Sequence, residues 1–527
     1  MDYVTVLTTA PRLLSAAMMA VGDYNTGALA QRLYGRGSTW LVHVSLQSCW
    51  FMQYCAGRTI TAVPETTVTM MALARYPWNN KQSSTSVSYV WWVGVGCCLR
   101  PTTAIFFLPL LLVHVYSCNN KIALSLKIIG TTLVVSALLC VADSAYYGSF
   151  TFVPWNFLRF NVLTGLADHY GRQPWHWYIS SGLPSALGPH VLLLLSALYT
   201  NYRRYAQLLL PCCFTLAVYS LIGHKEIRLL LPLLPPLLLI VGDQVTLLLK
   251  TQTRSNNTSV LCSRRNLLLG LLIIPNAALL LYFGVAHQRG PLSVVTELNA
   301  MVMQHQSGPA DGTINLHHVS ATSLPLLLFL MPCHSTPLYS HLHMPVATRF
   351  LTCEPNLQGL PGYVDEADRF YEHPEAWLAA HLPYQRSDAR KGKQEGIVNR
   401  EHAAYGEKLL KDTPKFKNNE LNYKSEDHIV TNTKSLISQE RNSNLTRIEL
   451  SEEVFTKIQQ HSSRYKYDVI DPLMNYPSHV IMFDKLATEM QNFLHDLGYQ
   501  ICSTVFHSYI KEGHRSNYIH VYCLPGT

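Results

Sequence analysis

The segment His224-Lys225-Glu226-Ile227-Arg228 places four ionisable side chains within five residues, between two apolar runs. The upstream run reads LLLPCCFTLAVYSLIG and the downstream run reads LLLPLLPPLLLIVG. Charge beside a membrane-spanning segment is costly unless it is paired or faces a polar cavity, and it therefore indicates a functional site. A simple flank of a span would need Lys225 and Arg228 but neither Glu226 nor His224. The segment suits the stabilisation of a phosphate with an acid and a base held nearby.

The chemistry of each side chain in this segment suggests a role. Arg228 and Lys225 are the first candidates for a phosphate, because guanidinium forms two parallel hydrogen bonds and ammonium is a compact point charge. His224 and Glu226 are the candidate catalytic residues, with His224 donating to the phosphate or to a sugar. Glu226 is expected mainly to orient the cations and only secondarily to act as acid or base, because perturbed groups are often structural ion pairs.

Other polar residues are predicted at the ends of membrane spans. Arg58 and Glu65 are about two helical turns apart and would share a face of a continuous helix, although Pro64 argues against that continuity. Two alternatives are equally favoured: Arg58 binds the phosphate and Glu65 a substrate, or the two residues form a structural ion pair within the bundle. Arg100 suits the phosphate or a snorkelling flank. Asp143 is interpreted as a helix cap more readily than as a substrate carboxylate.

The stretch 143–185 is too long and too aromatic to be a simple connection. Tryptophan and tyrosine are enriched at membrane–water interfaces, and long ordered loops are commonly functional. We expect an interfacial re-entrant or amphipathic segment that recognises lipid or sugar, with a plain aromatic belt as the alternative. Aromatic faces and a few polar groups suit a sugar ring, and the candidates are Asn161, His169, Trp175, His176 and Trp177.

The composition predicts a polytopic α-helical membrane protein with a soluble part. Charged residues make up 14% of the 527 residues, against roughly 25% in soluble proteins. Expected spans lie near residues 4–22, 38–56, 60–76, 86–99, 101–117, 122–142, 186–200, 205–223, 229–249 and 266–286. The net charge of +8 is interpreted as cytosolic topology signals, and no motif points to nucleic acid.

Lysine and arginine distribution predicts the orientation of the spans. Loops with Arg32, Arg75, Lys121, Arg203 and Lys250 are expected in the cytosol. The stretch 143–185 and the charged segment then face the opposite side, the lumen of the endoplasmic reticulum (ER). On this count residue 1 is luminal without a signal peptide, which leads us to expect a further span and luminal loop upstream of this sequence.

After about residue 287 the pattern changes to a strand–helix alternation that predicts a small luminal α/β domain. VTELNAMVMQHQ has an amphipathic helical pattern, LPLLLFLMP is interpreted as a buried strand, and further strands are expected in SHVIMFD, STVFHSYI and YIHVYC. The predicted division is 1–286 for the multi-span catalytic domain, 287–383 with 467–527 for the α/β domain, and 384–466 for a disordered polar insertion. Asn444 in the insertion starts an N-glycosylation sequon.

Cysteine and histidine in the α/β part allow two interpretations. Four cysteines could form disulfides in a luminal domain, with the pairing left open: Cys333, Cys353, Cys502 and Cys523. His334, His341 and His343 beside Cys333 invite a zinc site, but their spacing matches no standard pattern. We therefore expect no metal, and favour structural hydrogen bonding or contact with the acceptor.

HKEIR resembles the His-Lys-Glu-x-Arg signature of the ER mannosyltransferases that use dolichyl-phosphate mannose and have the GT-C membrane fold. FNVLTGLADHYGRQPWHWYISSGLP and MPCHSTPLYSHLHMPVATRFLTCEPNL resemble the branch of this family that builds glycosylphosphatidylinositol (GPI) anchors, as do DEADRFYEHPEAWL and the stretch from SHVIMFD to YIHVYC. The similarity runs from about residue 4 to the C-terminus and is interrupted by 384–466. HKEIR alone indicates only the wider family, whereas the tryptophan-rich and CHSTP stretches are more specific.

The resemblance implies an enzyme of the ER membrane that transfers mannose in α1,2 linkage onto the second mannose of the lipid-linked GPI precursor. Its partners would be that precursor and dolichyl-phosphate mannose, with no cofactor. Such an inverting transfer needs a carboxylate base and positive charge for the departing phosphate. The family has an acidic catalytic residue in its first luminal loop, so we expect the main base to lie outside this chain.

Three alternatives remain at this stage. Another dolichyl-phosphate-mannose enzyme would add the fourth GPI mannose or act on N-glycan precursors, but the CHSTP and QPWHWY stretches argue against it. A transporter or scramblase would favour paired inverted repeats, which the sequence does not show. An inactive interaction protein would keep the charged segment without the base.

Overall fold

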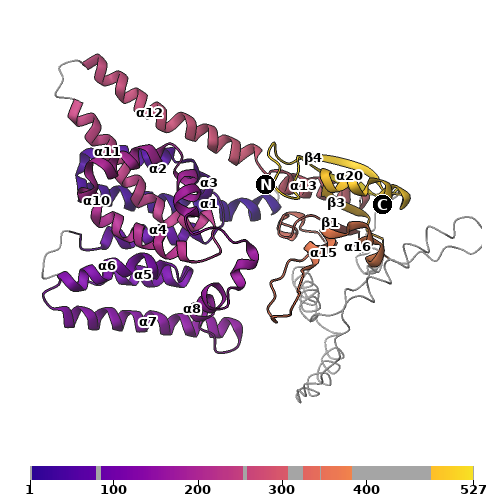
Figure 1. Cartoon of the computed structure of the whole chain (residues 1–527), viewed down its shortest axis with the longest axis horizontal. Coiled ribbons are helices and arrows are strands. Elements are labelled where there is room, and N and C mark those ends of the chain that lie inside the picture. The colour runs from indigo at the N-terminus through magenta and orange to yellow at the C-terminus, as the bar shows by residue number, and fades with distance from the viewer. Residues whose placement is uncertain are drawn as a thin grey trace, which may run out of the picture.

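The computed structural model describes residues 3–78, 85–252, 258–306, 325–344, 346–382 and 476–525. A helical part that extends to Ala286 is followed by a five-stranded sheet with its own helices, and the two parts lie side by side (Figure 1). The insertion expected at 384–466, and with it Asn444, lies outside the described residues.

The helical part begins with a bundle in which several elements are short. Its first elements are α1 (Tyr3–Tyr34), α2 (Arg36–Ser48), α3 (Trp50–Ala56), α4 (Ala62–Arg75), α5 (Ser88–Leu99), α6 (Thr103–Ser117) and α7 (Lys121–Tyr147). Short pieces follow: α8 (Val153–Leu158), η1 (Arg159–Leu163), η2 (Leu166–Tyr170), η3 (Tyr178–Gly182) and α9 (Leu183–Leu187). The part ends with α10 (His190–Leu221), η4 (Ile227–Leu233), α11 (Leu234–Gln252), α12 (Thr258–Leu281) and η5 (Tyr282–Ala286).

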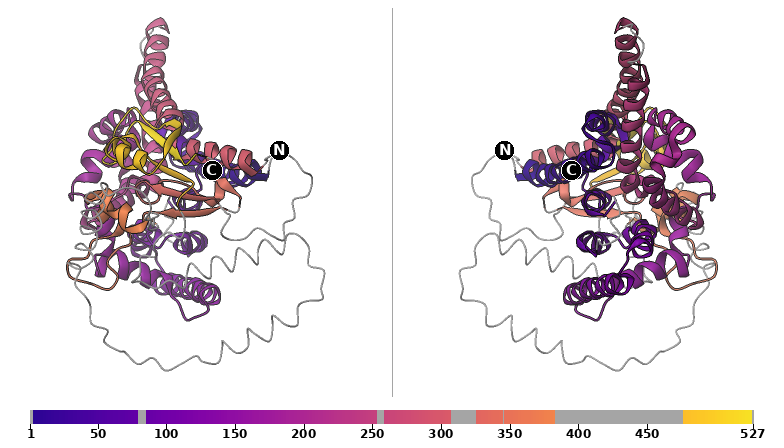
Figure 2. Two further views of the ribbon diagram at one scale, coloured as in Figure 1. Left: turned by 90° about the vertical axis from the view of Figure 1, so that its right-hand side faces the viewer. Right: turned by 90° about the vertical axis from the view of Figure 1, so that its left-hand side faces the viewer.

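Fewer helices than the ten expected spans are long and apolar enough to cross a membrane. Among the described residues three stretches qualify, Lys121–Tyr147, Ile227–Lys250 and Arg265–Met303, and a fourth qualifies if the bent pair Tyr178–Leu187 and His190–Leu221 is one span. The expected span 38–56 is divided at Cys49, and α5 and α6 are only 12 and 15 residues long. Helix α12 stands clear of the bundle along much of its length (Figure 2).

A polar cluster marks the boundary between the expected spans 186–200 and 205–223. The backbone of Asn201 leaves the helical region inside α10 (φ −138°, ψ 27°), and its side-chain amide donates to Gln244 Oε1 at 2.9 Å. Arg204 donates to both oxygens of the buried Asp243 at 2.7 and 3.2 Å. Arg204 therefore neutralises a carboxylate within the bundle.

The sheet has the order β2-β1-β3-β5-β4. Its strands are β1 (Leu326–Leu330), β2 (Ala347–Phe350), β3 (His479–Phe483), β4 (Gln500–Phe506) and β5 (Tyr518–Cys523). Strand β1 pairs in parallel with β2 and β3, whereas β5 pairs antiparallel with β3 and β4. The strands expected in LPLLLFLMP, SHVIMFD, STVFHSYI and YIHVYC are confirmed.

Helices cover both faces of this sheet, which explains why β1 is a continuous apolar run. They are α13 (Gly290–Gln306), α14 (Tyr339–Leu342), α15 (Glu366–Glu372), α16 (Pro374–His381) and α20 (Asp484–Asp496). Leu327 and Phe329 pack with α13 residues such as Leu298. Leu328 and Leu330 point to the other face and belong to the cluster that contains residues of α15, α16 and α20.

Helices α2 and α11 approach each other closely at Gly242. A Cβ on Gly242 would lie 2.5 Å from the backbone Cα of Val42, and both residues are in the core of the bundle. Because the obstacle is backbone, only a shift of one helix could accommodate a side chain there.

Gly242→Ala is therefore expected to destabilise the helical part by about 1–3 kcal/mol, as overpacking of a core does. Thermal unfolding of the purified protein in detergent measures the effect. Gly270→Ala in α12 is the matched control, because its Cβ would only touch Ile274 at 3.8 Å. Equal thermal unfolding midpoints for the two variants would contradict the close packing of α2 on α11.

Candidate active site

The charged segment forms a compact cluster between the end of α10 and the start of η4. Glu226 lies at its centre: Arg228 donates to both of its oxygens, through Nη2 at 2.8 Å to Oε1 and through Nε to Oε2. His224 Nε2 lies 3.2 Å from Oε1. The Arg228 side chain is nevertheless 55% exposed, so part of its guanidinium is open to a ligand.

The electrostatics of Glu226 favour its charged form. Burial alone would raise the pKa of Glu226, but the hydrogen bonds and charges of Arg228 and His224 bring it below its ordinary value. The carboxylate therefore carries its charge at neutral pH and orients the Arg228 guanidinium and the His224 ring. This is the role that the sequence favoured for Glu226 over that of an acid or base.

The segment 143–185, called the long loop below, contacts this cluster through its stretch 168–173. His224 Nδ1 contacts the carbonyl of Gly171 at 3.0 Å, and the Gln173 amide donates to the Gly223 carbonyl at 3.1 Å. Arg172 and His224 form an isolated β-bridge. Two segments about fifty residues apart are thus joined by backbone pairing, which no local pattern in the sequence indicates.

Lys225 binds this stretch through its ammonium group. The side chain is buried, and Nζ donates to the carbonyl of Gln173 at 3.2 Å and to the carbonyl of Ile222. Burial lowers the pKa of Lys225, whereas the nearby Asp168 carboxylate raises it. An ammonium has three donors: one holds the loop at Gln173, one binds the Ile222 carbonyl at the end of α10, and the third has no partner within the described residues and can meet a ligand.

Tyr178 connects this cluster to the bundle. Its buried hydroxyl accepts the Glu226 amide at 3.3 Å, and Arg100 lies within electrostatic reach of it. Helix α4 packs against η4. The pair formed by Arg100 and Glu65, with Nη1 and Oε2 3.4 Å apart, is therefore close to the charged segment.

Arg58 and Glu65, for which a structural ion pair was one of two equal alternatives, do not pair with each other in the structure. The helix is interrupted because α3 ends at Ala56 and α4 begins at Ala62, and Pro64 takes the first turn of α4, where its missing N–H is tolerated. The exposed Arg58 stacks on Tyr54, 3.7 Å from the ring centroid. Glu65 is buried, is paired with Arg100, and accepts from the Thr102 hydroxyl at 2.9 Å.

The interpretation of Asp143 as a helix cap is also wrong. It lies inside α7, which continues to Tyr147 and ends at Gly148 with a left-handed backbone (φ 68°), a common helix ending. One of its oxygens, Oδ2, is buried without a hydrogen-bond partner in the described part of the chain.

The sugar-recognition candidates are divided among different surroundings. Asn161 in η1 donates to the Phe157 carbonyl of the preceding helix α8, and Trp177 packs beside Gly182 near Leu230 of η4. Trp175 is 69% exposed and pairs edge-on with His176. His169 instead reaches the α/β part, with Nε2 3.4 Å from Oδ2 of Asp365.

The cysteines of the α/β part form two disulfides, Cys333–Cys353 and Cys502–Cys523. Within the described residues, the ligand atoms of Cys333, His334 and Cys353 lie within 4.8 Å of one another, but both sulfurs are oxidised. Zinc binds cysteine as a thiolate, so the disulfide-bonded Cys333 cannot be one of its ligands. His341 contacts the hydroxyl of Ser340 at 3.0 Å.

Comparisons with known proteins show the family of this chain. Residues 2–343 match the model of a family described as Alg9-like mannosyltransferases. The chain belongs to this family. All of the candidate site residues from Arg58 to Arg228 lie in the matched range, whereas β3, α20, β4 and β5 lie beyond it.

Individual Alg9-like relatives are similar over most of this chain. The GPI alpha-1,2-mannosyltransferase 3 of Mus musculus is 36% identical over 378 residues, which is 72% of this chain and 65% of that protein. The Homo sapiens protein of the same name is 36% identical, covering 72% and 63%, and GPI mannosyltransferase 3 of Drosophila melanogaster is 33% identical, covering 73% and 64%. This chain thus spans somewhat less than two thirds of the length of each of these three relatives.

Among solved structures, ArnT from Cupriavidus metallidurans in the apo state aligns with a TM-score of 0.46 and 12% identity, covering 97% of this chain and 83% of that one. A likeness this weak carries no argument about the fold.

The sequence interpretation missed the residues that hold the cluster together. Asp168, Gly171, Gln173 and Gly223 contribute mainly backbone and close approach, which leave no charge pattern in the sequence. Gly223 gives the clearest signal in retrospect, because it is a glycine immediately before four ionisable side chains.

Gly223→Ala is expected to separate the loop from the cluster, because a Cβ there would meet the Asp168 carboxylate. The Gln173 amide, which donates to the Gly223 carbonyl, should then exchange its hydrogen on the order of tenfold faster. Hydrogen–deuterium exchange with mass spectrometry measures this change. Gly130→Ala, which meets nothing within 4 Å, is the control, and unchanged exchange in Gly223→Ala would refute the backbone pairing.

Proposed function

We propose that this chain transfers mannose from dolichyl-phosphate mannose, in α1,2 linkage and with inversion, onto the second mannose of the lipid-linked GPI precursor. The observation that carries the proposal is the cluster in which Glu226 orients Arg228 and His224 beside apolar helices. Membership of the Alg9-like family and the printed names of the relatives support the same reaction.

The cluster suits a departing lipid phosphate. Arg228 lies in the first turn of η4, which leads into an apolar stretch long enough to cross a membrane, so a lipid phosphate at the membrane surface would meet its exposed guanidinium. Preorganised positive charge at a leaving phosphate is among the strongest contributions to such transfers. Arg228 and the remaining donor of Lys225 supply that charge, so the proposed reaction needs no metal or other cofactor.

The base for the acceptor hydroxyl is a separate part of the proposal. Glu226 is held by Arg228 and His224, and Glu65 by Arg100 and Thr102, so both carboxylates have orienting roles here. A catalytic acidic residue in the family's first luminal loop, as the resemblance implies, would supply the base.

We further propose the GT-C fold, a multi-pass location in the ER membrane, and a luminal α/β part. Disulfides form and persist in oxidising compartments such as the ER lumen. The two disulfides of the α/β part therefore support its luminal location. Trp175 and His176 are exposed and follow closely after the stretch 168–173 that contacts the cluster, and we assign them to the sugar acceptor.

The proposal is tested by mannose transfer with purified full-length protein, radiolabelled dolichyl-phosphate mannose and synthetic GPI precursors. Product should form on the two-mannose acceptor, and Arg228→Ala should lower kcat/KM on the order of a hundredfold. Arg203→Ala is the matched control, because Arg203 is also an exposed arginine but contacts Tyr202 within α10.

The choice of acceptor separates the proposal from its nearest alternative. A different result is transfer of mannose onto a three-mannose GPI precursor or an N-glycan precursor and not onto the two-mannose one. In that case the acceptor is the one that receives mannose, and the two-mannose assignment is wrong. If a protein that binds the donor transfers mannose onto none of these acceptors, the proposal that this chain is a mannosyltransferase is refuted.

A further inference from the structure

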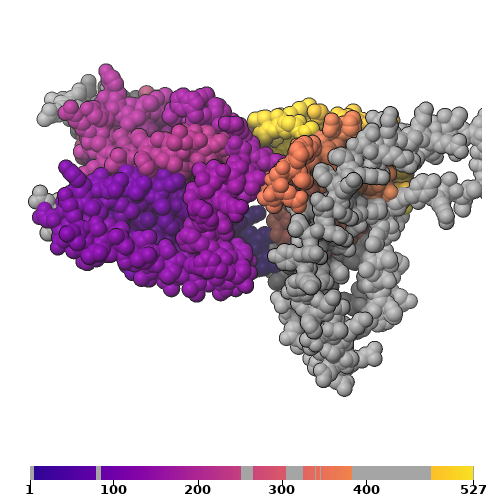
Figure 3. All heavy atoms as spheres, turned by 60° about the horizontal axis from the view of Figure 1, so that its bottom comes forward, coloured from indigo at the N-terminus to yellow at the C-terminus, as the bar shows by residue number. Residues whose placement is uncertain are grey.

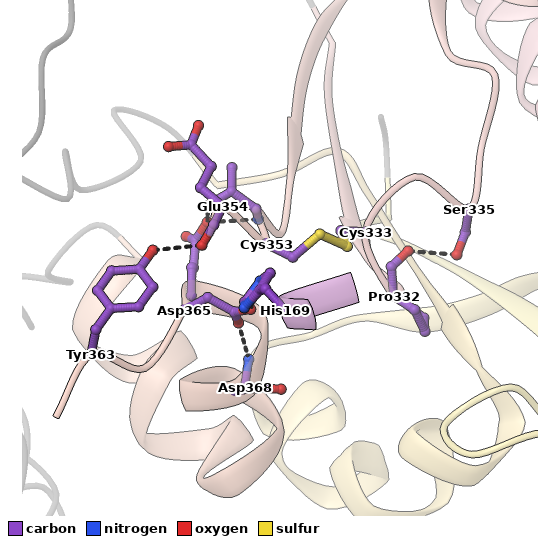
Figure 4. Close-up of a disulfide and its surroundings, with 11 residues drawn as sticks. His169, Pro332, Cys333, Ser335, Cys353, Glu354, Tyr363, Asp365 and Asp368 are labelled. Carbon is purple, nitrogen blue, oxygen red and sulfur yellow. Dashed lines mark hydrogen bonds and ion pairs between the residues drawn. A yellow bond between two sulfur atoms is a disulfide. The ribbon is translucent and has the colours of Figure 1, made fainter. Parts of the chain in front are cut away.

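One contact connects the α/β part to the loop that lines the cluster. His169 belongs to η2 in the long loop, and its Nε2 lies 3.4 Å from Oδ2 of Asp365, the N-cap residue of α15. Figure 4 shows His169 beside Asp365 and near the Cys333–Cys353 disulfide. Figure 3 shows the orange segment of the α/β part against the magenta surface of the helical part.

Asp365 is held in place on its own side of this contact. Its Oδ1 accepts the amide of Asp368 at 2.7 Å, as an N-cap does, which leaves Oδ2 for His169. The side chain is only 6% exposed. One carboxylate therefore performs two separate tasks with its two oxygens.

The surroundings of Asp365 are fixed by the disulfide and by its neighbour Glu366. The Cys333–Cys353 bond ties the stretch before α15 to the end of β1. Glu366 is buried, is paired with Arg349, and accepts from both the amide and the hydroxyl of Thr352 at 2.9 and 2.6 Å. Asp365 thus offers a rigid acceptor to the loop.

On the other side, His169 is directly followed by the stretch that contacts the charged segment. The rings of His169 and Tyr170 pair edge-on at 5.4 Å, and Tyr170 pairs with His224 at 6.3 Å. Gly171 and Gln173 then offer their carbonyls to His224 and Lys225. A displacement of His169 would therefore pass to both of these side chains.

We propose that Asp365 and His169 are positioning residues, through which the α/β part holds the stretch 168–173 against His224 and Lys225. The proposed effect on mannose transfer rests on the function proposed above, whereas the effect on the loop does not. Neither residue needs to touch substrate: the pair acts by fixing the backbone carbonyls that orient the His224 and Lys225 side chains.

Two substitutions separate the contact from its structural surroundings. Asp365→Ser keeps an N-cap, since serine is also a good capping residue, but its shorter side chain cannot reach His169. His169→Ala removes the contact from the loop side and leaves the α/β part intact. Asp368→Ser is the matched control, because it removes an exposed carboxylate from the same helix turn.

The first readout does not depend on activity. Arg172 is exposed, so trypsin cleavage after it reports whether the stretch 168–173 is detached. Cleavage should be on the order of tenfold faster in Asp365→Ser and in His169→Ala than in wild type or Asp368→Ser. Equal rates in all four proteins would overturn the proposal, whether or not the enzyme is active.

The second readout is the KM for dolichyl-phosphate mannose, which is unaffected by a smaller fraction of folded protein. Each single variant should raise it roughly tenfold, since small misplacements of binding groups have effects of this size. The double variant should match the singles, because both remove the same contact. His169→Lys, which places an ammonium donor opposite Asp365, should recover most of the affinity.

Additive effects of the two substitutions, or no recovery in His169→Lys, would overturn the coupling. If wild-type protein transfers no mannose at all, the proposed function fails, and the cleavage assay alone decides whether the contact positions the loop.

Discussion

The structure of this site depends on one constraint, the need to neutralise charge at the edge of an apolar bundle. Glu226 meets it by binding Arg228 and His224, and Lys225 meets it by donating to two backbone carbonyls. Because each charge is paired, the group can lie between α10 and η4 without the cost of isolated buried ions. The same pairing fixes the positions of the cations before any ligand arrives.

This arrangement makes the long loop part of the site. The stretch 168–173 supplies carbonyls rather than charges, so it orients His224 and Lys225 without competing for a phosphate. The loop is itself held from the other side by Asp365 of the α/β part. Residues from three distant regions of the sequence therefore determine the geometry of four neighbouring side chains.

The sequence predicted those features that leave a local pattern. Charge within apolar runs identified His224 to Arg228, and the strands of the α/β part followed from short apolar runs such as LPLLLFLMP. Pairing between distant segments could not be predicted in this way. The partner of Glu65 is Arg100 rather than Arg58 because the chain breaks between α3 and α4, and Asp143 lies inside α7 because nothing after it stops that helix before Gly148. His169 was expected at a sugar, and its contact with Asp365 depends on the folding of a separate part of the chain.

The central claim is that Arg228 in this cluster binds the phosphate of the lipid donor. The most direct measurement is a cryo-electron microscopy structure of the full-length protein with dolichyl phosphate bound. The account predicts density for the phosphate within hydrogen-bond distance of Arg228, with Glu226 still between Arg228 and His224. A lipid phosphate bound elsewhere on the protein, with the Arg228 guanidinium still paired only with Glu226, would contradict it.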